Sequence, residues 1–184
     1  MRLHLIRHPR LLIAPGVCYG SSDVPVCPDD MESTLAALLP ALPAGVPIFS
    51  SPLARCRELA ARLAHALSSA PPIHDKRLVE MHFGDWEMRA WEAIRKEDID
   101  AWVADLAFYR PGGGENGMQV AKRLNDFLED AKSLRAEDII VVTHAGVIRL
   151  LLEIAAGVDL LSAALSVART PRKIDCGELI ALDC

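Results

Sequence analysis

The segment 138–143, Asp-Ile-Ile-Val-Val-Thr, places four apolar β-branched residues in a row. A strand that is apolar at every central position must be buried on both of its faces. Similar short apolar runs occur at 3–6 and 46–49, and weaker ones at 73–79 and 179–182. Strands of this kind need a sheet that is covered on both sides, so we expect helices in the intervening segments.

Those segments do contain apolar residues at helical spacing. Ser51 suits the N-cap and Pro52 the first position of one such helix. The expected helices cover 32–42, 52–67, 86–106, 116–134 and 147–156. Strands that alternate with helices predict an α/β fold, a three-layer sandwich with a mostly parallel central sheet and helices on both faces. We see no repeat or linker, so one domain is expected over residues 1–184.

Charge and cysteine content narrow the classes of function. The formal net charge is −5 at pH 7, which disfavours non-specific nucleic-acid binding and means that any anion site must be built locally from a few cations. The five cysteines form no CxxC pair, so a zinc site or a disulfide framework is not expected. No apolar run reaches the roughly 18 residues of a membrane helix, and the N-terminus lacks a signal-peptide core. We therefore expect a cytoplasmic protein, either a monomer or a homodimer.

Polar residues follow three of the expected strands at the point where each strand ends. Arg7 and His8 follow the first strand, Arg55 lies shortly after the second, and His144 follows the strand 138–143. Ligands of open α/β sheets bind beyond the carboxyl ends of the strands. These four side chains are therefore candidates for one crevice.

Arg55 is expected near the first turn of its helix, where the helix dipole disfavours a cation. A bound anion such as phosphate would offset this and would match the planar guanidinium. The alternatives stay open at this point: Arg55 can simply face solvent, and each histidine can be an ordinary core or surface residue. Spacing alone does not decide whether Glu80, Asp85 or Glu87 is a catalytic carboxylate.

Five segments together resemble the histidine phosphatase superfamily, which is also called phosphoglycerate mutase-like. They occur in the order of the family, and they are Leu-Ile-Arg-His at 5–8, Ser-Ser-Pro-Leu-Ala-Arg-Cys at 50–56, the stretch 78–87, Pro-Gly-Gly-Gly-Glu at 111–115, and Val-Val-Thr-His-Ala-Gly at 141–146. The resemblance implies the phosphoglycerate mutase-like fold and a phosphomonoester hydrolase that needs neither metal nor cofactor.

The resemblance also implies a role for each residue. His8 would form a phosphohistidine, while Arg7, Arg55 and His144 would hold the phosphoryl oxygens and Glu80 would donate a proton to the leaving group. This division of labour is chemically coherent, because phosphoryl transfer needs positioning and charge stabilisation above all. A neutral imidazole held in one tautomer can serve as the nucleophile.

The chain departs from the family pattern beside the nucleophile. Pro9 stands where the family usually has glycine, and proline fixes φ and removes a backbone donor. The polar residues that follow in the family are replaced by Leu11, Leu12 and Ala14. Tyr19 or the backbone of Gly20 is the substitute phosphate ligand that we consider.

The expected substrate is a small phosphorylated molecule. The stretches 17–25 and 80–89 look like those of α-ribazole-5′-phosphate phosphatases of cobalamin biosynthesis. Trp86, Trp91 and Trp102 are candidates to stack a flat base, although packing in the core is the more common use of tryptophan. The alternatives are a phosphoprotein phosphatase acting on phosphohistidine, or a non-catalytic phosphate-binding module.

Overall fold

The computed structural model describes residues 1–169 and 173–184. Its five strands form one sheet in the order β3-β2-β4-β1-β5. They are β1 (Arg2–Arg7), β2 (Ile48–Ser50), β3 (Ile73–His74), β4 (Asp138–Thr143) and β5 (Leu179–Asp183). All neighbours are parallel except β5, which runs antiparallel to β1 at the edge of the sheet. The expected mostly parallel sheet is confirmed.

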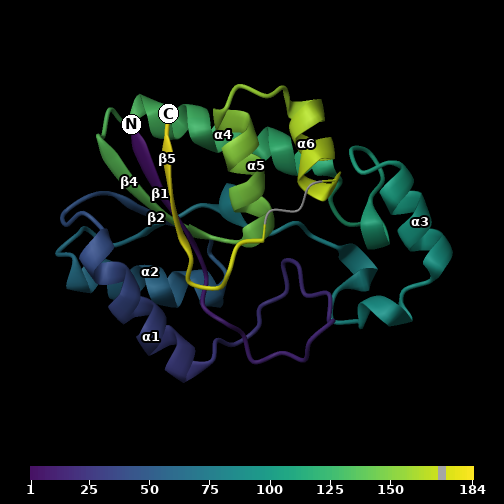
Figure 1. The fold of residues 1–184 in the computed structure, drawn as a ribbon, viewed down its shortest axis with the longest axis horizontal. Helices are drawn as coiled ribbons and strands as arrows, with labels where there is room; N and C mark the ends of the chain where they lie inside the picture. The colour runs from purple at the N-terminus through teal and green to yellow at the C-terminus, as the bar shows by residue number, and fades with distance from the viewer. Residues whose placement is uncertain (170–172) are drawn as a thin grey trace.

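Helices cover both faces of this sheet, as Figure 1 shows. On one face, α1 (Pro28–Leu38) and α2 (Ala54–Ala66) pack against alternate strand residues such as Ile140 and Val142. On the other face, α4 (Gly117–Ser133), α5 (Ala145–Ala155) and α6 (Leu160–Arg169) pack against Ile139 and Val141. These four strand residues are completely buried. The uninterrupted apolar strand therefore has the physical cause that we inferred, and the three-layer sandwich is confirmed.

The start of α2 differs from the expectation. The helix begins at Ala54, so Ser51 is not its N-cap and Pro52 is not its first residue. The carboxylate of Asp23 accepts the N–H of Ala54 (2.9 Å) and so supplies the cap from a distant loop. The hydroxyl of Ser51 contacts His144 instead (2.9 Å).

The segment 86–106 was expected to be one helix, and this prediction is wrong. Only α3 (Lys96–Ala104) is α-helical there, because Trp86, Trp91 and Trp102 pack with one another instead of lining one helix face. Short 3₁₀ turns occupy Leu39–Ala41, Lys76–Leu78, Gly84–Trp86, Trp91–Ala93 and Pro111–Gly113.

Two further elements differ. The strand expected over 73–79 ends at His74, because the carboxylate of Asp75 accepts the N–H of Arg77 (2.8 Å) and starts a turn. Helix α6 was not anticipated, although its first turn carries a local signal, since Asp159 accepts the N–H of Ser162 (3.0 Å). Among the described residues, no helix is both long enough and apolar enough to cross a membrane.

The sheet register places the chemistry-bearing residues side by side. Arg7 is paired with Thr143, and Ser50 is paired with Val142. The three strands β1, β4 and β2 therefore end at the same level, and His8, His144 and Ser51 come directly after those ends.

Candidate active site

His8 leaves β1 as a buried side chain with a defined tautomer. It is 1% exposed, and its Nδ1 lies 2.7 Å from the carbonyl oxygen of Pro9. A carbonyl can only accept, so Nδ1 carries the proton and the lone pair of Nε2 is free to attack.

His144 precedes α5 and lies against His8, with 5.3 Å between the ring centroids. Its Nδ1 accepts from Nε of Arg55 (3.2 Å), since a guanidinium can only donate. Its Nε2 therefore carries the proton and donates to the hydroxyl of Ser51 (2.9 Å). His144 is thus a neutral donor that is held in place from both sides.

Arg55 is completely buried, so the alternative that it faces solvent is wrong. Its guanidinium donates to the carbonyl oxygens of Gly20 and Ser22, each at 2.6 Å, and lies 5.4 Å from the ring centroid of Tyr19. These carbonyls offset the cation at the start of α2. Three of its five N–H groups are used in these bonds and in the one to His144, which leaves two for a phosphoryl oxygen.

Arg7 reaches the same region from the end of β1. Its Nη1 donates to the carbonyl oxygen of Ile174 (2.6 Å), while its buried Nε has no hydrogen-bond partner among the residues that the structure describes. A buried N–H without an acceptor is costly, so this edge of the guanidinium favours an incoming oxyanion.

The structure separates the three candidate carboxylates. Glu80 faces the pocket and accepts the N–H groups of Met81 (3.0 Å) and Gly146 (3.1 Å). Glu87 instead joins two loops. Burial alone would raise its pKa, but hydrogen bonds, first from the Ser22 hydroxyl and then from the N–H of Phe83, lower it. Asp85 is exposed. Of the three carboxylates, Glu80 is the one that lines the pocket.

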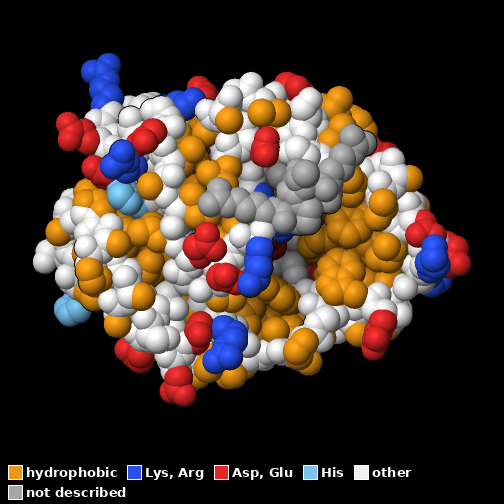
Figure 2. Space-filling model, in the orientation of Figure 1, with side chains coloured by type: hydrophobic (Ala, Val, Ile, Leu, Met, Phe, Trp, Pro, Cys, Tyr) orange, Lys and Arg blue, Asp and Glu red, His pale blue; other side chains and the backbone are white. Residues whose placement is uncertain are grey.

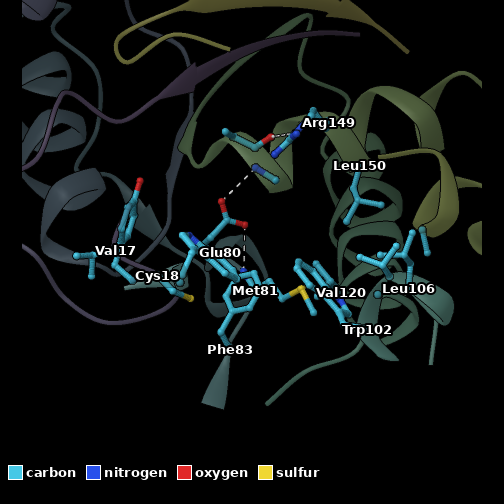
Figure 3. A pocket seen from close by; sticks show the side chains of 18 of the residues that line it. Val17, Cys18, Glu80, Met81, Phe83, Trp102, Leu106, Val120, Arg149 and Leu150 are labelled. Atoms are coloured by element: carbon cyan, nitrogen blue, oxygen red, sulfur yellow. Dashed lines mark hydrogen bonds between the residues drawn. The ribbon is translucent and has the colours of Figure 1, made fainter. Parts of the chain in front are cut away.

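A pocket of about 720 Å³ opens beside this cluster. Arg7 and Glu80 line it, whereas the buried side chains of His8, Arg55 and His144 are not among its lining residues. Figure 3 shows Glu80 between the Val17–Cys18 side and the Trp102–Leu106 side. The rest of the lining is mostly apolar: Val17, Cys18, Tyr19, Gly20, Met81, Phe83, Trp91, Trp102, Val103, Leu106, Gly117, Val120, Ala145, Gly146, Arg149, Leu150 and Ala164.

The three tryptophans lie in two kinds of place, the core and the lining of the pocket. Trp86 is buried and belongs to the core, whereas Trp91 and Trp102 pack face to face (6.0 Å, 7°) and also line the pocket. Figure 2 shows hydrophobic side chains gathered on the surface between α6 and α3. The pocket therefore has one polar end, near Arg7 and Glu80, and one apolar end.

Burial controls the protonation of both histidines. It lowers the pKa of His8 to about 3; the Pro9 hydrogen bond opposes this, while the positive charges of Arg55 and Arg7 add to it. Burial also lowers the pKa of His144 well below its ordinary value, with the charge of Arg55 as the next cause. Within residues 1–169 and 173–184, no cluster of three His, Cys, Asp or Glu side chains is arranged to hold a metal ion.

Comparison with known proteins agrees with this arrangement. A family model described as "Histidine phosphatase superfamily (branch 1)" matches residues 3–168. The chain belongs to the histidine phosphatase superfamily. This confirms the predicted enzyme class, a phosphatase.

Three relatives illustrate the range within the superfamily. The chain is 33% identical to an adenosylcobalamin/alpha-ribazole phosphatase of Escherichia coli, which covers 83% of this chain and 77% of that protein. It is 34% identical to a metal-independent phosphoserine phosphatase of Arabidopsis thaliana. That match covers 56% of this chain and 46% of the Arabidopsis protein, which is about half of its length. An alpha-ribazole phosphatase from Shigella flexneri has a TM-score of 0.82 at 28% identity, covering 100% of this chain and 90% of that one.

Arg149 is a pocket residue that was not predicted from the sequence. It lies on α5, lines the pocket and donates from Nε to the carbonyl oxygen of Ala145 (3.2 Å), as Figure 3 shows. The available signal was a single cation in the otherwise apolar first half of that helix. The carbonyl oxygen of Gly20 accepts from Arg55, and a carbonyl cannot donate to phosphate, so the backbone N–H is the group of Gly20 that could serve as a phosphate ligand.

The buried histidines of this superfamily member predict a loss of stability in mild acid. In the unfolded chain both residues titrate near pH 6.5, whereas in the folded protein they stay neutral. The unfolded state therefore binds more protons below pH 6.5. As the pH is lowered, the free energy of unfolding decreases by up to about 1.4 kcal/mol per pH unit for each histidine.

Urea unfolding at several pH values between 7 and 5 measures this slope. His8→Asn should reduce it by about half, since one of the two groups is removed. Carboxylates whose pKa is lowered in the folded protein, such as those of Asp75 and Glu87, add to this slope mainly below about pH 5. A free energy of unfolding that stays constant from pH 7 to 5 would contradict the assigned neutral state.

Proposed function

We propose that this chain hydrolyses phosphomonoesters through a phosphohistidine formed on His8. The observation that carries the proposal is the free Nε2 lone pair of His8, fixed by the Pro9 carbonyl, among Arg7, Arg55 and His144. A nucleophile that is neutral at pH 7 is ready to attack without losing a proton first.

In the first step, Nε2 of His8 attacks phosphorus and the bond from phosphorus to the leaving oxygen breaks. Glu80, in its acid form, gives its proton to that oxygen. In the second step, a water molecule loses a proton to the Glu80 carboxylate and attacks phosphorus, and the P–N bond breaks. Inorganic phosphate leaves, and both His8 and Glu80 return to their starting states. The remaining donors of Arg7 and Arg55 stabilise the phosphoryl oxygens in both steps, and the Nε2–H of His144 joins them when it turns from the Ser51 hydroxyl to the phosphoryl group.

We propose α-ribazole 5′-phosphate, a phosphate ester that carries a flat aromatic base, as the substrate. The apolar end of the pocket, with Trp91, Trp102 and Phe83, supports an aromatic group rather than a small polar one. The names of the Escherichia coli and Shigella flexneri relatives point the same way. Phosphoserine is the second candidate because of the name of the Arabidopsis relative.

A substrate panel tests this choice. We expect kcat/KM for α-ribazole 5′-phosphate to exceed that for phosphoserine, and Trp102→Leu to lower the first value about 3- to 10-fold, the usual worth of one aromatic stacking contact. The value for phosphoserine should not change. Phe108→Leu is the matched control, since Phe108 is 58% exposed and lies outside the pocket lining.

The opposite result is equally clear. A preference for phosphoserine that Trp102→Leu leaves intact would favour the second candidate. A preference for phosphohistidine peptides over both small molecules would favour a phosphoprotein phosphatase.

A cytoplasmic location and a single domain over residues 1–184 stay predictions.

A further inference from the structure

We propose that Arg123 and Glu115 are positioning residues that hold the segment carrying Glu80 in its active geometry. The inference rests on the proposed role of Glu80 as the proton donor. Neither residue lines the pocket, so both would act through the backbone of that segment and not on the substrate.

The two side chains form an ion pair between α4, which carries Arg123, and the segment just before it, which carries Glu115. Arg123 donates from Nε to one carboxylate oxygen of Glu115 (2.9 Å) and from Nη2 to the other (3.0 Å). Their side chains are only 16% and 27% exposed. A two-point guanidinium–carboxylate contact fixes direction as well as distance.

This ion pair is bonded to the main chain on both sides of Glu80. Before Glu80, Nη1 of Arg123 donates to the carbonyl oxygen of Arg77. After Glu80, Oε2 of Glu115 accepts the N–H of His82 (3.1 Å). The N–H of Glu115 also donates to the carbonyl oxygen of His82 (2.7 Å). The four residues 78–81 are therefore anchored to α4 at both ends.

The glycines before Glu115 permit this close approach. A Cβ atom on Gly114 would lie 2.0 Å from the carbonyl oxygen of His82, a distance that only glycine avoids. The Gly-Gly-Gly-Glu stretch thus allows its backbone to approach the segment that carries Glu80, a role that the proposed chemistry does not assign.

The opposite side of the same segment is bonded to the end of β4 and the start of α5. Thr143 donates its hydroxyl to the carbonyl oxygen of Leu78 (2.7 Å), and Gly146 donates its N–H to Glu80 itself (3.1 Å). If the ion pair is removed, this inner set of contacts remains, together with the backbone hydrogen bond from Glu115 to His82. Glu80 would then keep its chemistry but lose its fixed position, and a displacement of about 1 Å can cost on the order of 100-fold in rate.

The leaving group reveals such a displacement. An alkyl phosphate needs a proton from Glu80 during the first step, whereas p-nitrophenyl phosphate releases a stable phenolate without one. Arg123→Met is expected to lower kcat/KM for an alkyl phosphate on the order of 10-fold. The value for p-nitrophenyl phosphate should stay close to that of the wild type, since kcat/KM reports steps up to phosphoryl transfer.

The design includes three companion variants. Glu115→Gln should show the same selective loss, and the double variant should lose no more than either single one, because both residues act through one contact. Lys122→Met is the matched control, since Lys122 neighbours Arg123 on α4 but forms an exposed ion pair with Asp126. Arg123→Lys should recover only part of the rate, as lysine lacks the two-point fork.

The Glu80→Gln variant separates failure of the inference from failure of the proposed function. If Glu80→Gln itself produces no leaving-group dependence, the proposed proton donor is wrong. If Glu80→Gln does so while Arg123→Met lowers both substrates equally, the ion pair has a general structural role only. Thermal unfolding of every variant shows whether any equal loss reflects unfolded protein.

Discussion

Turnover by the His8→Ala variant is expected to fall on the order of 10⁴-fold or more, the range produced when a covalent nucleophile is lost. No other neutral nitrogen can take its place, because Nδ1 of His144 accepts from Arg55 and Nε2 of His144 carries its proton. The variant should still bind phosphate, since Arg7 and Arg55 are retained.

Rapid quenching of the wild-type enzyme with labelled substrate supplies the direct measurement. We expect label on His8 as a phosphohistidine, which is stable in alkali and labile in acid. The His8→Asn variant is the better control for folding, because the asparagine amide retains a donor for the Pro9 carbonyl. Undiminished turnover in either variant, or label on another residue, would contradict the proposed mechanism. Tight phosphate binding with no labelled intermediate would identify a non-catalytic binding module.

Glu80→Gln should have the second largest effect, a loss on the order of 10²- to 10⁴-fold for alkyl phosphates, the usual contribution of general acid catalysis. Glutamine has the same shape but offers no acidic proton. Its amide group must also face either the N–H of Met81 or that of Gly146, so a stability loss of about 1 kcal/mol is expected as well.

The measurement is kcat/KM over a series of phosphates whose leaving groups differ in basicity. The slope should be steep for Glu80→Gln and shallow for the wild type. Glu87→Gln is the matched comparison, because Glu87 joins the loops of Ser22 and Phe83. That variant should lose stability, by about 1 to 3 kcal/mol, without leaving-group dependence. A steep slope for Glu87→Gln and a shallow one for Glu80→Gln would exchange their roles.

The sheet was predictable because its cause is local. The uninterrupted apolar run 139–142 favours a place inside a covered sheet, and the structure buries both faces of β4. The segment 86–106 misled because its helical composition competes with long-range packing. Trp86 and Trp91 contribute more by burial in the aromatic cluster than the helix would gain from propensity.

The site was predictable only in part, for the same reason. Strand ends meet wherever parallel strands are in register, so His8 and His144 were expected to lie together, and their rings do. The contacts that specify their states come from distant loops. Neither the carbonyl oxygens that bind Arg55 nor the Ser51 hydroxyl that binds His144 leaves any mark in the local sequence. The role of Glu80 could not be separated from that of Glu87 until the loops were in place.

The position of β1 in the sheet has a consequence for the order in which the molecule assembles. Arg2 pairs with Asp138 on one side and with Asp183 on the other, so both partners of the strand before His8 lie far along the sequence. Pairings of such large sequence separation form slowly, because the loop must close before the contact is made. Strand β1 is thus expected to become ordered late, and His8 reaches its position only once these pairings have formed. Before these pairings form, the apolar segment Leu3–Ile6 is unpaired and exposed, so we expect chaperones to bind it.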